Sequence, residues 1–572
     1  MRSLLAFFLV AIWPAFAAAD EPRVKLVVHV VFDQLRGDFI DKWQPHFGEG
    51  GFKRLQTKGA WFTDCHYPYA ITTTGPGHAA MLTGASPNKT GIINNEWYDR
   101  AAAATVNCAT SDRYQLVPAP VPEKVDPLAT PVKPKSPGNP DRLLSPTLGD
   151  VLKAAAKPGK VFGLSLKDRS AIFPTGHKQD GAYWFDGRFV TSTYFREAPH
   201  AWVEEFNKSK RADAWFGKSW TKTRPTLDYE TLAGPDDGSG EGKGVAQGVK
   251  FPHMIDGGLK VAGKKYYEAL ANSPFGNELL LDFAKACIDA EKLGQDDAPD
   301  LLTISFSSND LIGHTWGPDS QEVLDTTLRS DAIVENLLKY LDGKVGAGQY
   351  ALMLTADHGI CPLPEFAAKE GKPGRRLSAV ALVVGCEKHL RETFGDIAKP
   401  KDDVESKVAP RYLEAVVAPY LYLNHRLLAA KKLKPDDVAL ALSEYLRTRE
   451  GVLQAYTYEG LKRGLVGDDA ISQRVLRSFH PDRSGDVYIV LRPYSIIGSV
   501  TLGESIATGT THGSPHAYDT HVPLLVFGPG VAGGKRAEAV TPLHSAAIGA
   551  HFLGTKAPKD AEYGLPKTLL AK

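Results

Sequence analysis

The stretch "VKLVVHVVF", from Val24 to Phe32, is a continuous apolar run that is rich in β-branched valine. A strand buried on both faces has this composition, whereas a strand with one wet face alternates apolar and polar side chains. The run therefore predicts a strand in the middle of a parallel sheet.

Similar apolar runs recur along the chain, and segments with helical spacing lie between several of them. The runs are "KVFGLSL" from Lys160, "DLLTISF" from Asp300, "QYALMLT" from Gln349, "AVALVVG" from Ala379, "DVYIVL" from Asp486 and "VPLLVFG" from Val522. Helices are predicted from Ser145, with that serine as cap and a proline at the first helical position, and from Ser320. Strands that alternate with helices predict an α/β fold with a mainly parallel sheet.

The composition is that of a globular protein, and the length exceeds what one compact core usually reaches. The chain has 572 residues, of which 43% are hydrophobic and 23% charged. Residues 117–141 are rich in proline, and residues 224–262 contain "GPDDGSGEGKG", so both segments are predicted to be loops. Residues 360–485 mix helical and basic segments and are predicted to form a smaller cap or insertion.

The first nineteen residues have the pattern of a secretory signal that is cleaved. Arg2 precedes an apolar run from Leu4 to Phe16, and the segments Ala15-Phe16-Ala17 and Ala17-Ala18-Ala19 each fit a small-residue cleavage site. The run is too short for a membrane span, and no later stretch reaches about 18 apolar residues. Loss of Arg2 leaves 66 of the 67 basic residues against 66 acidic ones. This balance argues against a protein that binds nucleic acid or another polyanion.

The five cysteines form no Cys-x-x-Cys pair, which argues against a cysteine zinc cluster. Export would make disulfides possible, and with an odd number at least one thiol is unpaired. The pairing cannot be read from the sequence.

Aspartate and histidine residues gather at the ends of the predicted strands. They are Asp33, Asp310, His314, Asp357, His358 and His512. Each of these residues alone could be a turn cap, part of a surface pair or a loop histidine. We interpret the neighbouring His516 and His521 as ordinary loop histidines. In an open α/β sheet, however, sites form outside the carboxyl ends of the strands. Six oxygen and imidazole ligands at one edge predict a pair of metal ions, with zinc favoured over manganese or iron.

The stretch "AITTTGPGHAAMLTG", from Ala70 to Gly84, places three threonines before Gly-Pro-Gly and a histidine. One interpretation is a strand end followed by a tight turn. The other is that one hydroxyl is presented on the turn as a nucleophile. The stretch alone does not decide between them.

Seven segments carry a resemblance to a known family: "VFDQLRGD", "TTTGPGHAAMLTG", "GIINNEWYD", "SLKDRSAIFPTGH", "SSNDLIGHTWGPDS", "TADHG" and "THGSPHAYDTHVPLL". They run from Val31 to Leu525 in the family's order. The chain resembles the alkaline phosphatase superfamily, in the branch of threonine-nucleophile enzymes that includes nucleotide pyrophosphatases/phosphodiesterases. Within it, the zinc alkaline phosphatases of the PafA and PhoK type are the most similar.

The resemblance implies a three-layer α/β/α fold with a mainly parallel central sheet and inserted cap segments. Residues 1–19 would be the signal peptide and residues 20–572 a single catalytic domain. The insertions would lie at about 100–145, 180–295 and 360–485.

The resemblance also implies a role for each matching residue. Thr74 would be the nucleophile, with Thr72 and Thr73 as the strand before it. Two zinc ions per chain would be held, one by Asp33, Asp357, His358 and the Thr74 oxygen, the other by Asp310, His314 and His512. The phosphoryl group would be contacted by Asn95, Lys167 and Arg169.

Physical chemistry agrees with these roles. A threonine hydroxyl is a weak nucleophile that metal coordination can activate, and two metals about 4 Å apart can stabilise both the attacking and the leaving oxygen. Preorganised donors stabilise the charge of the phosphoryl transition state. Lys167 and Arg169 are two residues apart, so on an extended segment both would point the same way.

The sequence therefore predicts an exported zinc-dependent alkaline phosphatase, periplasmic or secreted, that hydrolyses small phosphate monoesters through a phosphothreonine intermediate. A monomer is compatible with the sequence. The alternative is a phosphodiesterase or nucleotide pyrophosphatase with the same two-metal site. Lys167 and Arg169 favour the monoester, because it carries one more negative charge than a diester. A sulfatase is disfavoured, since the chain has no Cys-x-Pro-x-Arg segment.

Overall fold

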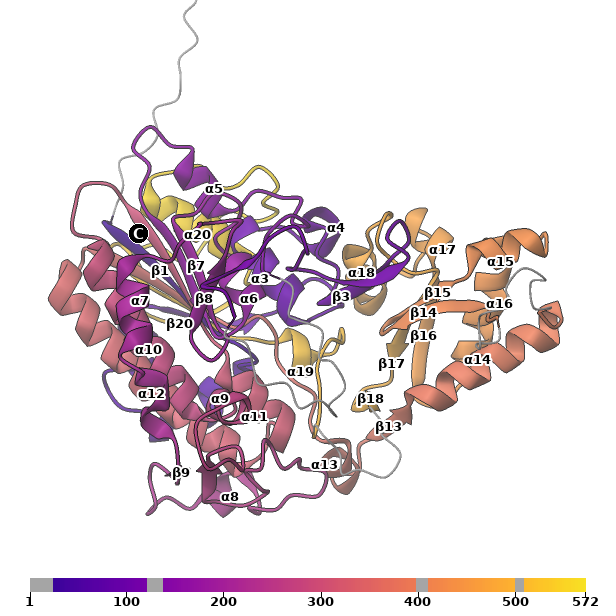
Figure 1. The fold of residues 1–572 in the computed structure, drawn as a ribbon, viewed down its shortest axis with the longest axis horizontal. Coiled ribbons are helices and arrows are strands. Elements are labelled where there is room, and N and C mark those ends of the chain that lie inside the picture. Colours follow the sequence, from indigo (N-terminus) through magenta and orange to yellow (C-terminus); the bar gives the residue numbers. More distant parts are fainter. Residues whose placement is uncertain (1–23, 121–136, 398–409, 499–508, 572) are drawn as a thin grey trace, which may run out of the picture.

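A ten-stranded sheet forms the centre of the molecule (Figure 1). The computed structural model of the chain describes residues 24–120, 137–397, 410–498 and 509–571, so the predicted signal peptide lies outside the described residues. In spatial order the strands are β20 (Gly534–Val540), β2 (Ala60–Cys65), β19 (Leu524–Phe527), β12 (Tyr350–Thr355), β1 (Leu26–Phe32), β11 (Asp300–Phe306), β6 (Val161–Ser165), β7 (Gly181–Phe185), β8 (Phe189–Ser192) and β5 (Leu116–Val117).

The first strand in chain order, β1, lies in the middle of this sheet. β1 pairs in parallel with β11 on one side and β12 on the other, so that Val28 lies opposite both Leu302 and Leu352. All seven residues of β1 are buried, as its unbroken apolar run predicts. The parallel pairing continues through β6 and β7. The predicted α/β fold with a mainly parallel sheet is confirmed.

One antiparallel strand brings a later segment to the same edge as the ends of the parallel strands. β19 runs opposite to β12, and its first residue, Leu524, pairs with Thr355, the last residue of β12. The chain that enters β19 therefore arrives beside the carboxyl ends of β1, β11 and β12. This pairing brings His512 within reach of the residues that follow those strands.

Helices cover both faces of the sheet (Figure 1). On one side α10 (Pro274–Glu291) packs against β11 and β6, and α12 (Gln321–Leu341) and α11 (Ser308–Trp316) pack against α10. On the other side α20 (His544–Leu553) contacts β1 and β12, and it is joined by α3 (Thr74–Thr83), α5 (Leu148–Lys153) and α6 (Asp168–Ile172). The helix predicted from Ser320 is confirmed as α12, and the Ser320 hydroxyl caps it by accepting the N–H of Val323.

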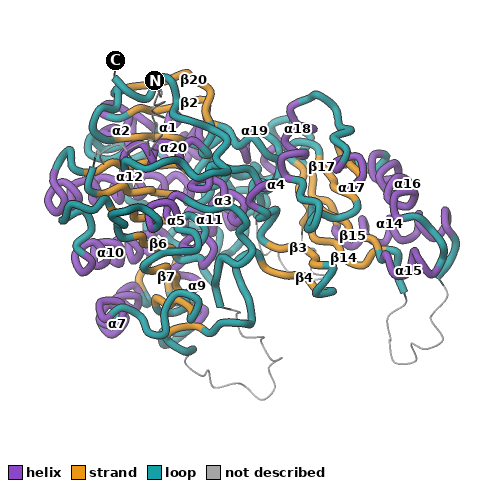
Figure 2. The backbone as a smooth tube through the Cα atoms, turned by 90° about the horizontal axis from the view of Figure 1, so that it is seen from above, coloured by secondary structure: helices purple, strands orange, loops and turns teal. Residues whose placement is uncertain are grey.

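A smaller antiparallel sheet lies beside the main body (Figure 2). Its order is β14 (Leu413–Val417), β15 (Tyr420–Leu423), β17 (Val487–Leu491) and β16 (Val452–Thr457), and it packs with α14 (Ala379–Phe394), α15 (His425–Ala430) and α16 (Pro435–Arg447). The small sheet meets the main body at two places. β14 contacts β3 (Glu96–Asp99), the partner of β4 (Ala104–Asn107) in a two-stranded sheet, and α18 (Ala470–Ser478) contacts α4 (Pro87–Thr90). The sequence-based division into insertions stays a prediction.

Two of the predicted strands differ from the structure. The run from Ala379 begins helix α14, which the Ser378 hydroxyl caps. Val380 and Val384 are 65% and 60% exposed, whereas Cys386 and Leu390 are buried, so one face alone packs on the small sheet. A short apolar run cannot be assigned to helix or strand from its periodicity. The run from Asp486 does form a strand, β17, but in the small antiparallel sheet.

The first predicted helix starts later than expected. Thr147, and not Ser145, is the cap of α5, because Asp150 and Thr147 each bind the other's main-chain N–H. This reciprocal arrangement satisfies two N–H groups and outcompetes the Ser-Pro start.

The predicted loops are partly confirmed. Residues 121–136 of the first loop lie outside the described residues. The second loop is mostly irregular but contains the short helix α8 (Tyr229–Ala233) and the strand β10 (His253–Ile255), which pairs with β9 (Lys218–Trp220).

All five cysteines are buried and free, so none of them forms the disulfide that export would allow. Within the described residues, we find no helix that has both the length and the apolar character needed to cross a bilayer.

Candidate functional site

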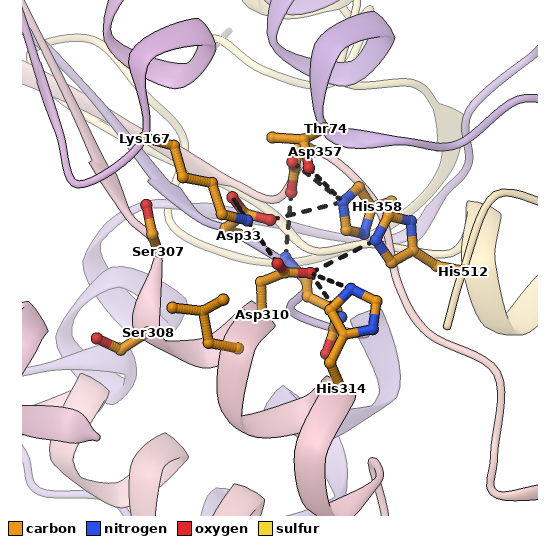
Figure 3. Close-up of polar contacts among 12 residues, drawn as sticks. Asp33, Thr74, Lys167, Ser307, Ser308, Asp310, His314, Asp357, His358 and His512 are labelled. Atoms are coloured by element: carbon orange, nitrogen blue, oxygen red, sulfur yellow. Dashed lines mark hydrogen bonds and ion pairs between the residues drawn. The ribbon is translucent and has the colours of Figure 1, made fainter. Parts of the chain in front are cut away.

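The six predicted ligands meet at the carboxyl edge of the central sheet (Figure 3). Asp33 follows β1 directly, and Asp357 and His358 follow β12. Asp310 and His314 lie one turn apart on α11, the helix after β11. His512 comes from the segment that leads into β19. The convergence follows from the strand order, since β1 lies between β11 and β12.

The first ligand set consists of Asp310, His314 and His512. Nε2 of His314 lies 3.2 Å from Asp310 Oδ1, and Nε2 of His512 lies 3.5 Å from the same oxygen. The Nδ1 of each ring is 2.8 Å from a main-chain oxygen, that of Thr510 for His314 and that of Thr72 for His512. Such contacts fix the tautomer, so that both Nε2 atoms are left as acceptors for a metal.

The second set consists of Asp33, Asp357 and His358, all fully buried. Nε2 of His358 lies 3.2 Å from Asp357 Oδ2 and 3.5 Å from Asp33 Oδ1, while its Nδ1 is 2.9 Å from the main-chain oxygen of Gly359. The two sets adjoin, because ligand atoms of Asp33, Asp310 and His358 also lie within 4.8 Å of one another. The rings of His358 and His512 stack at 3.5 Å.

Burial and close contact shift the pKa values of the carboxylates and imidazoles at this edge. Burial and the neighbouring Asp357 raise the pKa of Asp33 to about 6. Burial opposes a charge on His358, yet the carboxylates of Asp357 and Asp33 raise its pKa to about 9. Burial, followed by the field of His358, lowers the pKa of His512 to about 3. The site therefore attracts positive charge at its carboxylates.

Two carboxylate oxygens have no hydrogen-bond partner among the described residues, although both are buried: Asp33 Oδ1 and Asp357 Oδ2. The groups beside them are imidazole nitrogens at 3.2–3.5 Å, that of His358 for both oxygens and that of His78 for Asp357 Oδ2. Buried carboxylate oxygens that accept no hydrogen bond are stabilised when a cation contacts them. The donor set is carboxylate oxygen and imidazole nitrogen without thiolate, which zinc accepts readily. The residues present therefore fit a bound metal.

Lys167 lies between the two sets. Its Nζ is 2.8 Å from Asp33 Oδ2 and 2.5 Å from Asp310 Oδ2. Burial disfavours its charge, but Asp310 and Asp33 more than offset this and raise the pKa of the ammonium above its usual value. Lys167 is thus a fixed positive charge at the centre of the site.

Arg169 does not share an extended segment with Lys167. Lys167 is the extended residue before α6, and Arg169 lies in the first turn of that helix. The predicted side-by-side geometry is therefore wrong, because the chain turns into a helix at Asp168. Nη1 of Arg169 lies 3.7 Å from Asp168 Oδ1, and although burial opposes its charge, Asp168, Cys108 and Asp33 raise the pKa of the guanidinium. Its Nε is buried and, within the described ranges, has no partner.

Thr74 is the first residue of α3, with its side chain only 1% exposed. Its Oγ1 lies 3.5 Å from His358 Nε2. Gly75, Pro76 and Gly77 form the first turn of this helix and not a separate tight turn, because a helix start tolerates a residue without an N–H. Thr72 and Thr73 precede it outside the named strands, with Thr73 extended as the helix cap.

The start of α3 is held close to the site by its neighbours. A side chain on Gly77 would overlap the main chain of Asp357, so only glycine allows this approach. Oδ1 of Asn95 accepts the N–H of Gly75 at 2.7 Å. Asn95 therefore lies beside the helix N-terminus, where main-chain N–H groups favour an anion.

His78 is a site residue that the sequence reasoning missed. Its Nδ1 donates to the main-chain oxygen of Thr74 at 2.9 Å and lies 3.2 Å from Asp357 Oδ2. Its Nε2 is 2.8 Å from the hydroxyl of Ser305. The four-residue spacing from Thr74 signals this contact once the stretch is recognised as a helix and not a turn. Histidines 516 and 521 bind main-chain oxygens, as expected for ordinary loop histidines.

Comparison with known proteins gives consistent matches over most of the chain. The family model described as type I phosphodiesterase / nucleotide pyrophosphatase matches residues 27–515. The chain is 33% identical over 524 residues to alkaline phosphatase PhoV of Synechococcus elongatus (strain ATCC 33912 / PCC 7942 / FACHB-805), which covers 90% of this chain and 87% of PhoV. It is also 33% identical over 533 residues to alkaline phosphatase PafA of Elizabethkingia meningoseptica. This alignment covers 91% of this chain and 90% of PafA.

The fold is similar to a solved structure as well. The crystal structure of wild-type alkaline phosphatase PafA superposes with a TM-score of 0.83 at 30% identity and covers 96% of this chain and 99% of PafA. A second PafA structure has substitutions of one threonine, one asparagine, one lysine and one arginine.

We expect His78→Phe to lower the free energy of unfolding by about 1–3 kcal/mol, because an aromatic ring still fills the site but Ser305 and the Thr74 carbonyl lose their hydrogen-bond partner. Urea unfolding followed by circular dichroism measures this. His389→Phe is the matched control: His389 stacks on Tyr445 in the smaller part of the molecule, and it should change stability by less than about 0.5 kcal/mol. Equal stability of the two variants would contradict the role given to His78.

Proposed function

The chain belongs to the type I phosphodiesterase / nucleotide pyrophosphatase family, and from this premise we propose that it is an exported, zinc-dependent alkaline phosphatase that works through a phosphothreonine intermediate. It is an enzyme of the alkaline phosphatase type, since PhoV and PafA are similar to it over about nine tenths of its length. The observation that carries the proposal is the pair of adjoining Asp/His sets, one of which contacts the hydroxyl of Thr74 through His358.

Two zinc ions are the proposed cofactors. Asp310, His314 and His512 would hold one, and Asp33, Asp357 and His358, with the Thr74 oxygen, would hold the other. When bound, the ions would supply positive charge that favours the ionised threonine and offsets the charge of the phosphate. Asp33 Oδ1 and Asp357 Oδ2, which accept no hydrogen bond within the described residues, support this assignment.

Thr74 is the proposed nucleophile. Its oxygen would form a bond to phosphorus while the bond from phosphorus to the ester oxygen breaks and the alcohol leaves with a proton. Water would then break the phosphothreonine bond, so that inorganic phosphate is released and the hydroxyl is restored. The place of Thr74 at the start of α3 supports this role, because the helix N-terminus favours the negative phosphoryl group.

The proposed phosphoryl contacts are Asn95, Lys167 and Arg169. Lys167 supplies a point charge between the two ligand sets, and Arg169 has an N–H with no partner within the described ranges. Asn95 lies against Gly75, next to the nucleophile. The PafA variant with a threonine, an asparagine, a lysine and an arginine replaced involves the same four residue types, which further supports the set.

These cations favour a monoester over a diester, since the monoester dianion carries the larger charge. The family also includes phosphodiesterases, so the two substrate classes must be compared directly. Residues 1–19 are the proposed signal peptide, and the mass of the exported protein tests their removal. Phosphate esters are the proposed substrates.

Removal of zinc is expected to abolish hydrolysis of an aryl phosphate and to lower the melting temperature, because a bound ion stabilises the folded state by mass action. Scanning calorimetry with and without a chelator measures the second effect. Restored activity on adding about two zinc equivalents supports the proposal. A fully active chain with fewer than two would contradict the two-ion site.

Thr74→Ala is expected to reduce kcat to background, while the melting temperature and the zinc proposed at Asp310, His314 and His512 stay close to those of the wild type. The change removes the atom that bonds to phosphorus but little packing volume. Thr72→Ala is the matched control; the Thr72 hydroxyl donates to the main-chain oxygen of Ser514, so this variant should keep most of its activity. If Thr72→Ala or Thr73→Ala abolished turnover and Thr74→Ala did not, the nucleophile would be misassigned.

Replacing Lys167 and Arg169 together by alanine should reduce kcat/KM for an aryl monoester by about a hundredfold or more. A charge-assisted contact is worth about 1.5–3 kcal/mol, and about 1.4 kcal/mol corresponds to tenfold in rate. The matching diester should lose much less, because it lacks the extra charge. Lys388→Ala, on the exposed face of α14, is a control for loss of a cation elsewhere. Equal losses on both esters would favour the diesterase alternative.

A further inference from the structure

Gln34, the residue after Asp33, contacts an aspartate of each ligand set. Its main-chain N–H donates to Asp357 Oδ1 at 3.1 Å, and its side-chain Nε2 donates to Asp310 Oδ1 at 2.6 Å. The residue is only 3% exposed. Gln34 therefore bridges Asp357 of the second set and Asp310 of the first.

The backbone of Gln34 has an unusual conformation that makes this bridge possible. Its φ is +71°, in the left-handed region that residues other than glycine rarely adopt. Residues kept in this region cluster at functional sites, where the surroundings hold them in place. Here the left-handed turn directs the N–H toward the end of β12 and the side chain toward α11.

Gly313 provides the space for the Gln34 amide. It lies on α11 between Asp310 and His314, and a methyl group there would overlap Oε1 of Gln34. Gly313 lies within a regular helix and its φ is not positive, so its backbone conformation does not require glycine. Close contact with Gln34 gives a reason for it.

We propose that Gln34 is a positioning residue that fixes the orientation of Asp310 and Asp357 together, and that Gly313 exists to admit its amide. The bridge leaves Asp357 Oδ2 free to face His358 and sets Asp310 Oδ1 toward His314 and His512. This inference rests on the proposed two-zinc site, where outer contacts to ligands typically change metal affinity or activity by about 10–100-fold.

Two variants test the bridge from its two sides. Gln34→Glu keeps the shape but replaces the donor with a carboxylate beside Asp310, and Gly313→Ala displaces the amide without touching Gln34 itself. Zinc affinity is measured by competition with a chromophoric chelator, and kcat/KM on an aryl monoester is measured in parallel. Both variants should bind the zinc at Asp310, His314 and His512 about tenfold more weakly or worse. The other zinc should be affected less, because the main-chain N–H to Asp357 remains.

A double variant distinguishes displacement of the amide from general damage to α11. In Gln34→Gly the amide is absent, so adding Gly313→Ala should weaken zinc binding no further. Gly385→Ala, where a methyl group would meet the hydroxyl of Tyr445 on another helix, is the matched control and should bind zinc as the wild type does.

The outcomes separate this inference from the proposed function. A wild-type chain that binds no zinc in this titration would overturn both. If the wild type binds two ions and Gln34→Glu and Gly313→Ala bind them equally tightly, the inference alone fails. Fully additive losses in the double variant would also overturn it, because Gly313 would then act independently of Gln34.

Discussion

Repulsion among three buried carboxylates is the constraint on which the site depends. Asp33, Asp310 and Asp357 meet at one edge of the sheet with almost no exposure to solvent. In a medium of low polarity such charges are stable only beside positive charge. Lys167 supplies one such charge to Asp33 and Asp310, and His358 stands beside Asp33 and Asp357. The two oxygens that His358 faces, Asp33 Oδ1 and Asp357 Oδ2, accept no hydrogen bond within the described residues, so a bound cation would stabilise them further.

The surrounding fold holds these charges together at the cost of local strain and close packing. Gln34 adopts a left-handed backbone between two of the carboxylates, and Gly77 lets α3 approach Asp357. His78 joins the same carboxylate to the main chain of Thr74. Thr74 and the Asp/His residues of the two sets are therefore parts of one connected polar network. A rigid arrangement of this kind reduces the reorganisation needed when charge develops on a bound phosphate.

The elements that the sequence predicted well are those whose pattern is unambiguous. The buried strands from Val24, Asp300 and Gln349 have long apolar runs, and an aspartate lies within four residues of the end of each. The run from Ala379 was misassigned because seven apolar residues fit a helix as well as a strand, and packing on the small sheet decided between them. The Gly-Pro-Gly stretch was read as a turn because glycine and proline usually break helices, yet the first turn of a helix accepts both.

By itself, the sequence determined the α/β fold class, the six aspartate and histidine candidates and the threonine stretch, because these depend on local pattern and on the order of strands along the chain. Tertiary structure alone decided how they meet. Strand order placed β1 between β11 and β12, and the reversed β19 brought in His512. The contacts of Gln34 with Asp310 and Gly313 join residues far apart in the chain. The contacts of His78 depend on helix α3, whose first residues have the sequence pattern of a turn. No local pattern reports such contacts, because they arise only when separate elements pack together.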